Sequence, residues 1–231
     1  MVDLLRRGLA EWGLDADKAE QLAQFAQLLL QKNEVMNLTA ITEPDAVAQL
    51  HLLDSAALLT VAEPDGRRVV DVGSGAGFPG VPLRILCPTV ELTLLDSLGK
   101  RVQFLRESCD SLGLTGVECV HARAEEFAAQ RRETYDFAVS RAVAALPVLC
   151  ELCLPLVRVG GQFLAMKSVG SDEELRAAAR AIRTLGGRVK RTVDYTIPTS
   201  DVRHRVIVID KIAPTPERYP RAFAKIKKSP L

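Results

Sequence analysis

The feature that most constrains the fold is a change of rhythm in the sequence after Gly66. Short runs of β-branched and other apolar residues there alternate with stretches that carry apolar residues at helical spacing. This alternation predicts strands joined by helices, and right-handed crossovers place such strands parallel in one sheet. The expected strands are 69–72, 91–95, 116–121, 135–140 and 162–166, and the expected helices are 82–86, 99–112, 124–131, 145–157 and 173–185.

The end of this region breaks the alternation. Residues 188–196 and 202–210 are two strand-like runs, and the stretch Ile197-Pro198-Thr199-Ser200 between them is typical of a hairpin turn. We therefore expect an α/β fold, a mostly parallel Rossmann-like sheet with an antiparallel hairpin at one edge.

The first 60 or so residues are predicted to be helical. Asp15 can cap a helix that begins at Ala16, and Thr42-Glu43-Pro44-Asp45 is a second capped start with its proline early in the turn. An apolar stripe at helical spacing follows the first cap, at Leu22, Phe25, Leu28 and Leu29. The chain then divides into a helical extension over 1–65, a main domain over 66–213 and a basic tail over 214–231.

Composition excludes several classes of protein. With 48% hydrophobic and 26% charged residues over 231 positions, the chain is close to the globular average, which excludes disordered and fibrous proteins. It has no run of about 18 apolar residues, so we expect no membrane span. The acid within its first seven residues argues against a secretory signal. The five cysteines are an odd number in apolar surroundings, which indicates reduced thiols and a cytoplasmic location.

The net charge of +1 conceals an uneven distribution. Residues 188–231 hold 11 Lys and Arg against 4 Asp and Glu, and the last 14 residues hold five basic side chains and no acid. A basic end on an acidic body indicates a polyanionic partner, although a solvated tail that keeps the protein soluble explains the charge equally well. We expect this tail to add no core element unless Tyr219 and Phe223 hold it against the body.

A glycine-rich loop follows the first expected strand and reads Asp-Val-Gly-Ser-Gly-Ala-Gly-Phe-Pro-Gly from Asp71 to Gly80. Gly73 and Gly75 allow a sharp turn and a close approach to a ligand at the carboxyl end of the strand. A dinucleotide fingerprint requires a small residue where Phe78 stands, and the Asp71 carboxylate would repel phosphates and attract a cation. A ligand with a ribose and a positively charged amino-acid end fits better than a pyrophosphate, and S-adenosylmethionine has both.

Acidic residues also follow the next two expected strands. Asp96 stands 21 residues after Gly75, where a carboxylate can accept hydrogen bonds from ribose hydroxyls; alternatively, it caps a helix that starts at Ser97. The stretch Arg123-Ala124-Glu125 follows the third strand and can receive the edge of an adenine, although alone it also fits the first turn of a helix.

These residues resemble a known family, the bacterial small-subunit ribosomal RNA methyltransferase G family, which is also called glucose-inhibited division protein B. The resemblance spans residues 37–167 and is looser in the basic C-terminus. The matching stretches are Asn37-Leu38-Thr39-Ala40-Ile41, His51-Leu52-Leu53-Asp54-Ser55, the loop from Asp71 to Pro82, Leu95-Asp96-Ser97 with Lys100-Arg101, Arg123-Ala124-Glu125, Ser140-Arg141-Ala142-Val143 and Met166-Lys167.

The resemblance implies a class I methyltransferase that uses S-adenosylmethionine to methylate N7 of a guanine, with ribosomal RNA or the small ribosomal subunit as partner. The sequence departs from the family pattern at Ser168, where glycine is expected, and in the tail, where residues 221–225 stand in place of a Gly-x-Pro stretch. The resemblance implies cofactor contacts at Gly73, Phe78, Ala124, Glu125 and Arg141, and the loop and strand ends add Asp71, Gly75, Asp96 and Ser97.

The residues after the fourth expected strand narrow the acceptor chemistry. The stretch 140–143 lacks the nucleophilic cysteine that cytosine C5 methylation needs, and it lacks the proline-rich motif that often accompanies amine methylation. Guanine N7 is already a nucleophile, so positioning suffices. Arg141 and Lys167 can hold a base or a phosphate beside the cofactor, and the resemblance suggests the same for Arg123. We expect replacement of Arg141 or Lys167 to leave folding nearly intact, because charged strand ends seldom support a core.

Other residues that often carry chemistry are assigned none. Cys150 and Cys153 lie in an apolar helix without a second pair, so we expect two half-buried thiols rather than zinc or redox chemistry. His51 is expected to pack against its apolar neighbours, with a substrate-side role only through the resemblance. His121 and His204 form no cluster in the sequence, and no metal site is assigned.

Two alternative functions remain open. A nicotinamide-dependent oxidoreductase uses a similar glycine loop, but Phe78 and the lack of a Tyr-x-x-x-Lys or comparable hydride-transfer site disfavour it. A ribosome-assembly factor with a vestigial nucleotide pocket is the non-enzymatic alternative, which the intact set of Gly73, Asp96 and Arg141 disfavours. We expect a monomer with no membrane partner.

Overall fold

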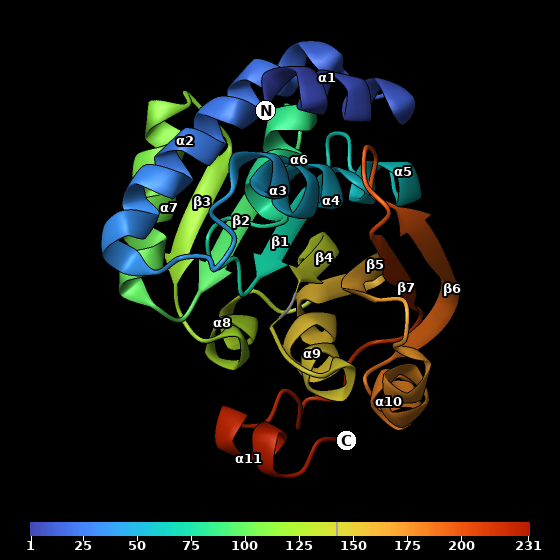
Figure 1. Cartoon of the computed structure of the whole chain (residues 1–231). Coiled ribbons are helices and arrows are strands. Elements are labelled where there is room, and N and C mark those ends of the chain that lie inside the picture. The colour runs from blue at the N-terminus through green and yellow to red at the C-terminus, as the bar shows by residue number, and fades with distance from the viewer. Residues whose placement is uncertain (142) are drawn as a thin grey trace.

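The computed structural model describes residues 1–141 and 143–231, in which the predicted alternation forms a seven-stranded sheet (Figure 1). The strand order is β3-β2-β1-β4-β5-β7-β6. Strands β1 to β5 pair in parallel, whereas β7 pairs antiparallel with both β5 and β6. The fold class predicted from the sequence is therefore confirmed. The strands are β1 (Arg68–Val72), β2 (Glu91–Asp96), β3 (Val117–His121), β4 (Tyr135–Arg141), β5 (Val157–Ser168), β6 (Gly187–Thr196) and β7 (Arg203–Lys211).

Strand β5 is longer than the sequence predicted. It begins at Val157 instead of residue 162 and runs through Gly160 and Gly161, which resemble a turn in the sequence. A β-carbon on Gly161 would lie 2.5 Å from the carbonyl oxygen of Asp136. Glycine is therefore required for the close approach of β5 to β4, and the pair marks tight packing rather than a break in the strand.

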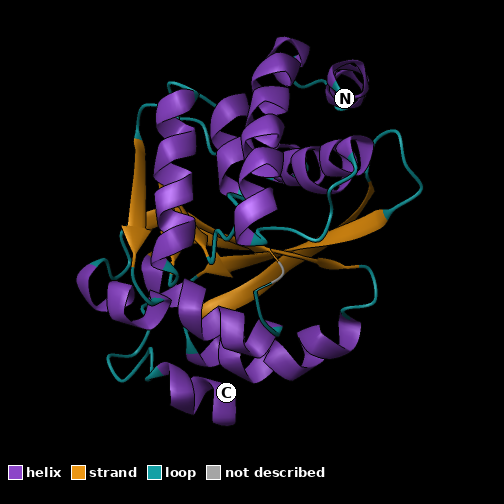
Figure 2. Ribbon diagram, turned by 60° about the vertical axis from the view of Figure 1, so that its left-hand side comes forward, coloured by secondary structure: helices purple, strands orange, loops and turns teal. Residues whose placement is uncertain are grey.

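Helices cover both faces of the sheet (Figure 2). Successive side chains of a strand point to opposite faces, so Val69 packs under one layer and Val70 under the other. The first layer holds α1 (Val2–Glu11), α2 (Ala19–Met36), α3 (Pro44–Val47), a π-helical turn (Ala48–Leu53), α4 (Asp54–Ala56), α5 (Leu58–Val61), α6 (Gly80–Leu86) and α7 (Gly99–Ser111). The second layer holds α8 (Ala124–Gln130), α9 (Leu146–Cys153), α10 (Asp172–Thr184) and α11 (Phe223–Lys228).

The two helix starts predicted near the N-terminus are confirmed. Asp15 accepts a hydrogen bond from the backbone N–H of Asp17 (3.0 Å), and Glu43 accepts two from the first turn of α3 (2.9 Å each). Beyond the first cap, Phe25 of α2 is fully buried with its ring 5.4 Å from that of Phe78 in the glycine loop. The N-terminal helices therefore share the core of the sheet and support the loop.

The C-terminal segment adds core residues, so the structure supports the alternative in which its aromatic residues hold it against the body. Tyr219 is 8% exposed and Ile226 is fully buried, both in the core that contains α9. Basic residues lie between these two positions, so the sequence shows no apolar pattern that would predict their burial. The division of the chain at residues 65 and 213 stays a prediction. None of the helices in the described residues is long and apolar enough to cross a membrane.

Candidate active site

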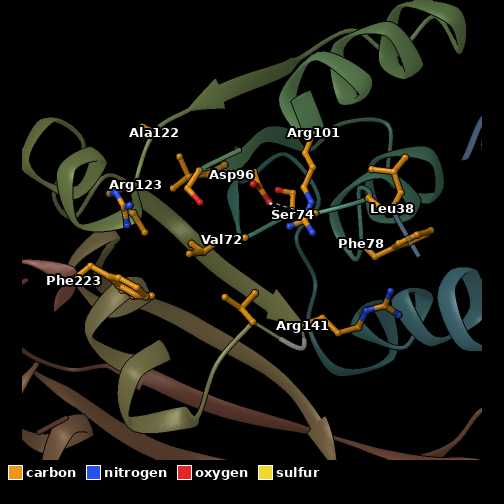
Figure 3. A pocket seen from close by; sticks show the side chains of 18 of the residues that line it. Leu38, Val72, Ser74, Phe78, Asp96, Arg101, Ala122, Arg123, Arg141 and Phe223 are labelled. Atoms are coloured by element: carbon orange, nitrogen blue, oxygen red, sulfur yellow. Dashed lines mark hydrogen bonds and ion pairs between the residues drawn. The ribbon is translucent and has the colours of Figure 1, made fainter. Parts of the chain in front are cut away.

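A cavity of about 420 Å³ opens at the carboxyl ends of strands β1 to β4, within the size range of small-molecule sites (Figure 3). Parallel strands present ligand sites at this edge of the sheet. The N-terminal helices and the C-terminal segment also contribute to its wall. The cavity brings together most of the predicted cofactor residues, namely Gly73, Gly75, Phe78, Asp96, Ser97, Ala124, Glu125 and Arg141.

The glycine loop lies against the end of β2. The N–H groups of Gly73 and Ser74 both donate to the Leu95 carbonyl oxygen, at 2.8 and 3.1 Å. Gly73 has a φ of +76°, and a β-carbon there would lie 2.5 Å from the side chain of Val143. Glycine is therefore required at this position both by the backbone conformation and by the loop after β4.

Asp96 holds the loop and the next helix together. One carboxylate oxygen accepts the N–H of Gly75 and the other accepts the N–H of Leu98, each at 2.9 Å. The residue is 4% exposed and still lines the cavity. Helix α7 begins at Gly99 with Leu98 as its N-cap, so the alternative in which Asp96 caps a helix that starts at Ser97 is wrong, although Asp96 holds the backbone that leads into α7. Each oxygen of a carboxylate has a further lone pair, so both roles are compatible with binding ribose hydroxyls.

Asp71 lies beneath the loop and does not line the cavity. It is fully buried; one of its oxygens accepts the N–H of Gly80 (2.9 Å), and the other has no hydrogen-bond partner among the residues that the structure describes. Burial raises the pKa of Asp71 to about 7. The predicted contact between this carboxylate and a cation is therefore not seen, and Asp71 instead fixes the start of α6.

Phe78 and His51 form a stacked pair in the wall. Their ring centroids are 4.6 Å apart with planes 23° from parallel, and the Arg141 guanidinium lies 4.9 Å from the Phe78 ring. His51 Nε2 is 2.8 Å from the hydroxyl of Thr39. Burial and the nearby Arg141 charge lower the pKa of His51 to about 4, so the imidazole is neutral at pH 7. His51 thus packs as expected, but it also lines the cavity.

Arg141 is tied to a buried carboxylate. Its guanidinium pairs with Asp54 at 2.7 Å, and Asp54 also accepts hydrogen bonds from Tyr195 and His204, each at 2.7 Å. Burial opposes the charge on Asp54, but these partners hold its pKa below the ordinary value, and the same contact raises the pKa of His204. Sequence reasoning missed this network, although Asp54 lies in the quoted stretch 51–55.

Of the two other predicted catalytic residues, one lies at the cavity and one does not. Arg123 is exposed at the rim, with its guanidinium 5.7 Å from the ring of Phe223. Lys167 donates to the Ala144 carbonyl oxygen (2.7 Å) and pairs with Glu174 (2.8 Å), so it fixes the segment after β4 and does not line the cavity.

Two further predictions concern residues near this segment. Cys150 and Cys153 are fully buried in α9, deeper than the half-burial predicted, and burial raises the pKa of both thiols. They are therefore inert packing residues. Ala142, which belongs to the quoted stretch after β4, lies outside the described residues.

The sheet topology, the glycine loop after β1 and the acid at the end of β2 define a class I methyltransferase. Solved structures share this fold. TYW2 of M. jannaschii, solved in complex with AdoMet, has a TM-score of 0.56 at 12% identity over 69% of this chain and 75% of that one. TrmN from Thermus thermophilus has a TM-score of 0.52 at 22% identity over 68% of this chain and 48% of that one.

The family is shown by closer relatives. The family described as rRNA small subunit methyltransferase G matches residues 18–203. The ribosomal RNA small subunit methyltransferase G of Alkaliphilus metalliredigens is 46% identical over 99% of this chain and 98% of its own length. That of Limosilactobacillus reuteri is 44% identical over 98% and 97%. The chain belongs to the rRNA small subunit methyltransferase G family, which confirms the resemblance, the enzyme class and the methyl donor expected from the sequence.

Proposed function

We propose that this chain transfers the methyl group of S-adenosylmethionine to N7 of a guanine in small-subunit (16S) ribosomal RNA. The observation that carries the proposal is the cavity itself, in which a glycine loop lies between a buried carboxylate and an arginine in a chain of this family. The nicotinamide alternative is disfavoured because Phe78 is fixed by stacking in the path of a pyrophosphate.

The cavity offers a partner to each part of the methyl donor. We place the ribose at Asp96, whose carboxylate retains free lone pairs, with Ser97 beside it. The adenine edge then meets Ala124 and Glu125 at the start of α8. The amino-acid end points the other way, toward the backbone of Gly73 and the Phe78 and Arg141 side chains.

The acceptor needs alignment rather than activation. The N7 lone pair attacks the methyl carbon in line with the departing sulfur, the electron pair of the carbon–sulfur bond stays on sulfur, and no proton moves. A general base is therefore unnecessary, which agrees with a neutral His51 of low pKa in the wall.

The charge of the reacting groups also favours this arrangement. Transfer moves a positive charge from the sulfonium to the guanine ring, and an unpaired cation beside the ring would oppose it. The Arg141 charge is compensated by Asp54 at 2.7 Å. Arg141 can therefore position the reactants without repelling the product. Arg123 lies at the rim with its guanidinium near the Phe223 ring, where it can hold a phosphate of the RNA, and Lys167 positions the segment after β4.

The partner we propose is small-subunit ribosomal RNA, either free or within the subunit. An exposed set of basic residues near the C-terminus suits a phosphate backbone. These residues are Arg218, Lys225, Lys227 and Lys228. We propose that the chain acts as a monomer in the cytoplasm, where ribosomes are made.

Calorimetry and a transfer assay test the proposal together. The protein should bind S-adenosylmethionine and ignore NAD, and it should label small-subunit RNA but not large-subunit RNA with a radioactive methyl donor. Tighter binding of NAD would establish the oxidoreductase instead. Binding of small-subunit RNA with no transfer would indicate the assembly factor.

A further inference from the structure

The C-terminal segment from Thr215 to Lys228 ends against the methyl-donor cavity, and Phe223 forms part of the cavity wall. Figure 3 shows Phe223 beside Arg123 on one side of Asp96, whereas Phe78 and Arg141 lie on the other side. A segment that the sequence assigns to a basic tail thus contributes an aromatic ring to the binding site.

The segment is fastened to α9 by a buried ion pair. Glu151 is fully buried, and its two oxygens accept hydrogen bonds from the Arg221 side chain at 2.7 and 2.6 Å. One of these oxygens also accepts the backbone N–H of Arg221 at 2.9 Å. A buried carboxylate is costly unless its partner fits well, so this pairing fixes the chain just before Phe223.

A second fastening lies a few residues earlier. Arg132 donates to the carbonyl oxygens of Tyr219 (2.7 Å) and Pro216 (3.1 Å), and it contacts that of Thr215 as well. A single guanidinium therefore orders the turn that leads into α11. The position of Phe223 is set from the body of the protein rather than by the short helix alone.

Helix α11 has an apolar side and a basic side. Phe223 is half-buried and Ile226 fully buried, whereas Lys225, Lys227 and Lys228 are exposed. The apolar side is continuous with the core between the sheet and the helix layer of α8 to α11. This core also includes Leu152 of α9, which lies in the cavity wall. The helix thus closes the cavity with its apolar side and leaves its lysines to solvent.

We propose that Phe223 is a binding residue for the adenine base of the methyl donor and that residues 215–228 form a fixed wall of its site. The inference rests on the proposed function. If Asp96 holds the ribose, the base lies toward the stretch 122–125, on the side where Phe223 lines the cavity. An aromatic face there offers the stacking contact that purine bases commonly make in proteins.

Phe223→Leu tests this contact because it keeps an apolar side chain of similar bulk and removes only the ring. The probes are S-adenosylmethionine and 5′-methylthioadenosine, which keeps the adenine and ribose but lacks the amino-acid end. Calorimetry should show that Phe223→Leu binds each probe at least about fivefold more weakly than the wild type does, as the loss of a base-stacking contact predicts. The factor should be similar for the two probes. The matched control is Glu217→Gln, which alters an exposed side chain of the same segment and should bind both probes like the wild type.

The outcomes separate the inference from the proposed function. If the wild type does not bind S-adenosylmethionine, the proposed function fails. If it binds and Phe223→Leu binds both probes equally well, the adenine contact is wrong. A lower melting temperature with unchanged affinity at a temperature where both proteins are folded would mean that Phe223 is structural only, which also overturns the inference.

Discussion

Asp96 holds the glycine loop and also lines the donor site, so its replacement affects both. In Asp96→Asn one carboxylate oxygen becomes an N–H₂ group, which cannot accept from a ribose hydroxyl or from a backbone N–H. A lost hydrogen bond of this kind costs about 1 kcal/mol or more where it is shielded from water. We expect calorimetry to find S-adenosylmethionine bound at least about tenfold more weakly, because 1.4 kcal/mol is one decade in affinity.

The control for this change is Asp110→Asn, which alters an exposed carboxylate on α7, the helix that follows Asp96. It should bind the donor like the wild type. Equal donor affinity in Asp96→Asn and the wild type would remove the ribose assignment.

Asp71 makes stability depend on pH in a specific direction. Burial raises the pKa of Asp71 from 3.8 to about 7, so between these values the folded state binds more protons than the unfolded state. The contribution of this group to stability is therefore lost as the pH rises through this window. Asn cannot ionise, so the free energy of unfolding of Asp71→Asn relative to the wild type should rise by about 1 kcal/mol or more from pH 5 to pH 8.

Urea denaturation of both proteins at the two pH values measures this difference, and Asp3→Asn on the exposed side of α1 is the control. A constant offset between Asp71→Asn and the wild type at both pH values would show that the buried carboxyl does not titrate in this range.

Arg141 is a structural residue as well as a site residue, which corrects the expectation that its loss would leave folding intact. Asp54 is 1% exposed, so Arg141→Ala leaves a buried carboxylate without its guanidinium. Removing one partner of a buried ion pair commonly lowers the free energy of unfolding by several kcal/mol. Because His204 still contacts Asp54, we expect this free energy to fall by about 2 kcal/mol or more. In Arg141→Ala/Asp54→Asn no charge is left unpaired, so part of the loss should be recovered.

Chemical denaturation of the two single variants and the double variant gives the coupling between the side chains. An Arg141→Ala protein as stable as the wild type would mean that Tyr195 and His204 satisfy Asp54 on their own, and the supporting role of Arg141 would be wrong.

At the scale of elements, the lysines of α11 remain candidates for phosphate contacts. The three lysines are exposed, and the helix is held by its apolar side, so replacing all three with alanine should leave the melting temperature almost unchanged. The slope of log affinity for small-subunit RNA against log salt should flatten by roughly 2–3 units, at about 0.7 to 0.9 per lost contact. A filter-binding titration at several salt concentrations measures it.

Helix α10 supplies the matched control, because Arg176, Arg180 and Arg183 are also three exposed basic residues on one helix. Their replacement by alanine should leave the slope unchanged. If both triple variants flatten the slope equally, the effect is one of net charge and α11 has no specific contact with RNA.

Local features of the sequence predicted the elements well. The alternation after Gly66, the Asp15 cap and the hairpin turn are read from neighbouring residues, and each appears in the structure. The glycine loop and Asp96 also lie within one strand–loop–strand unit, so the donor site could be placed from their spacing. The early start of strand β5 was not predicted, because its first residues include Gly160 and Gly161, and glycine within a strand weakens the strand signal even where it serves close packing.

Contacts between distant segments could not be predicted in this way. Asp54 meets His204 across 150 positions and Tyr195 across 141, and no periodicity connects them. The expectation that Lys167 lies at the cavity fails for a different reason, since its partner is only seven positions further along the chain. A strand-end lysine looks available in the sequence, but its actual partner, Glu174, comes from the segment that follows the strand.

At the scale of the whole molecule, both ends of the chain converge on one cavity. Thr39 and His51 come from the N-terminal region, the sheet supplies the centre, and Phe223 comes from the C-terminal segment. Truncation after Thr215 should therefore lower stability and donor affinity together. This differs from the behaviour of a free basic tail, which would lose only RNA binding.

The most direct test of the account is to identify the methylated nucleoside. Small subunits that lack the modification are incubated with the protein and S-adenosylmethionine that carries a labelled methyl group, and the RNA is digested to nucleosides for mass spectrometry. The account predicts label in 7-methylguanosine from small-subunit RNA and in no other nucleoside. Label in a methylated cytosine, adenine or ribose, or none in the presence of bound donor, would contradict it.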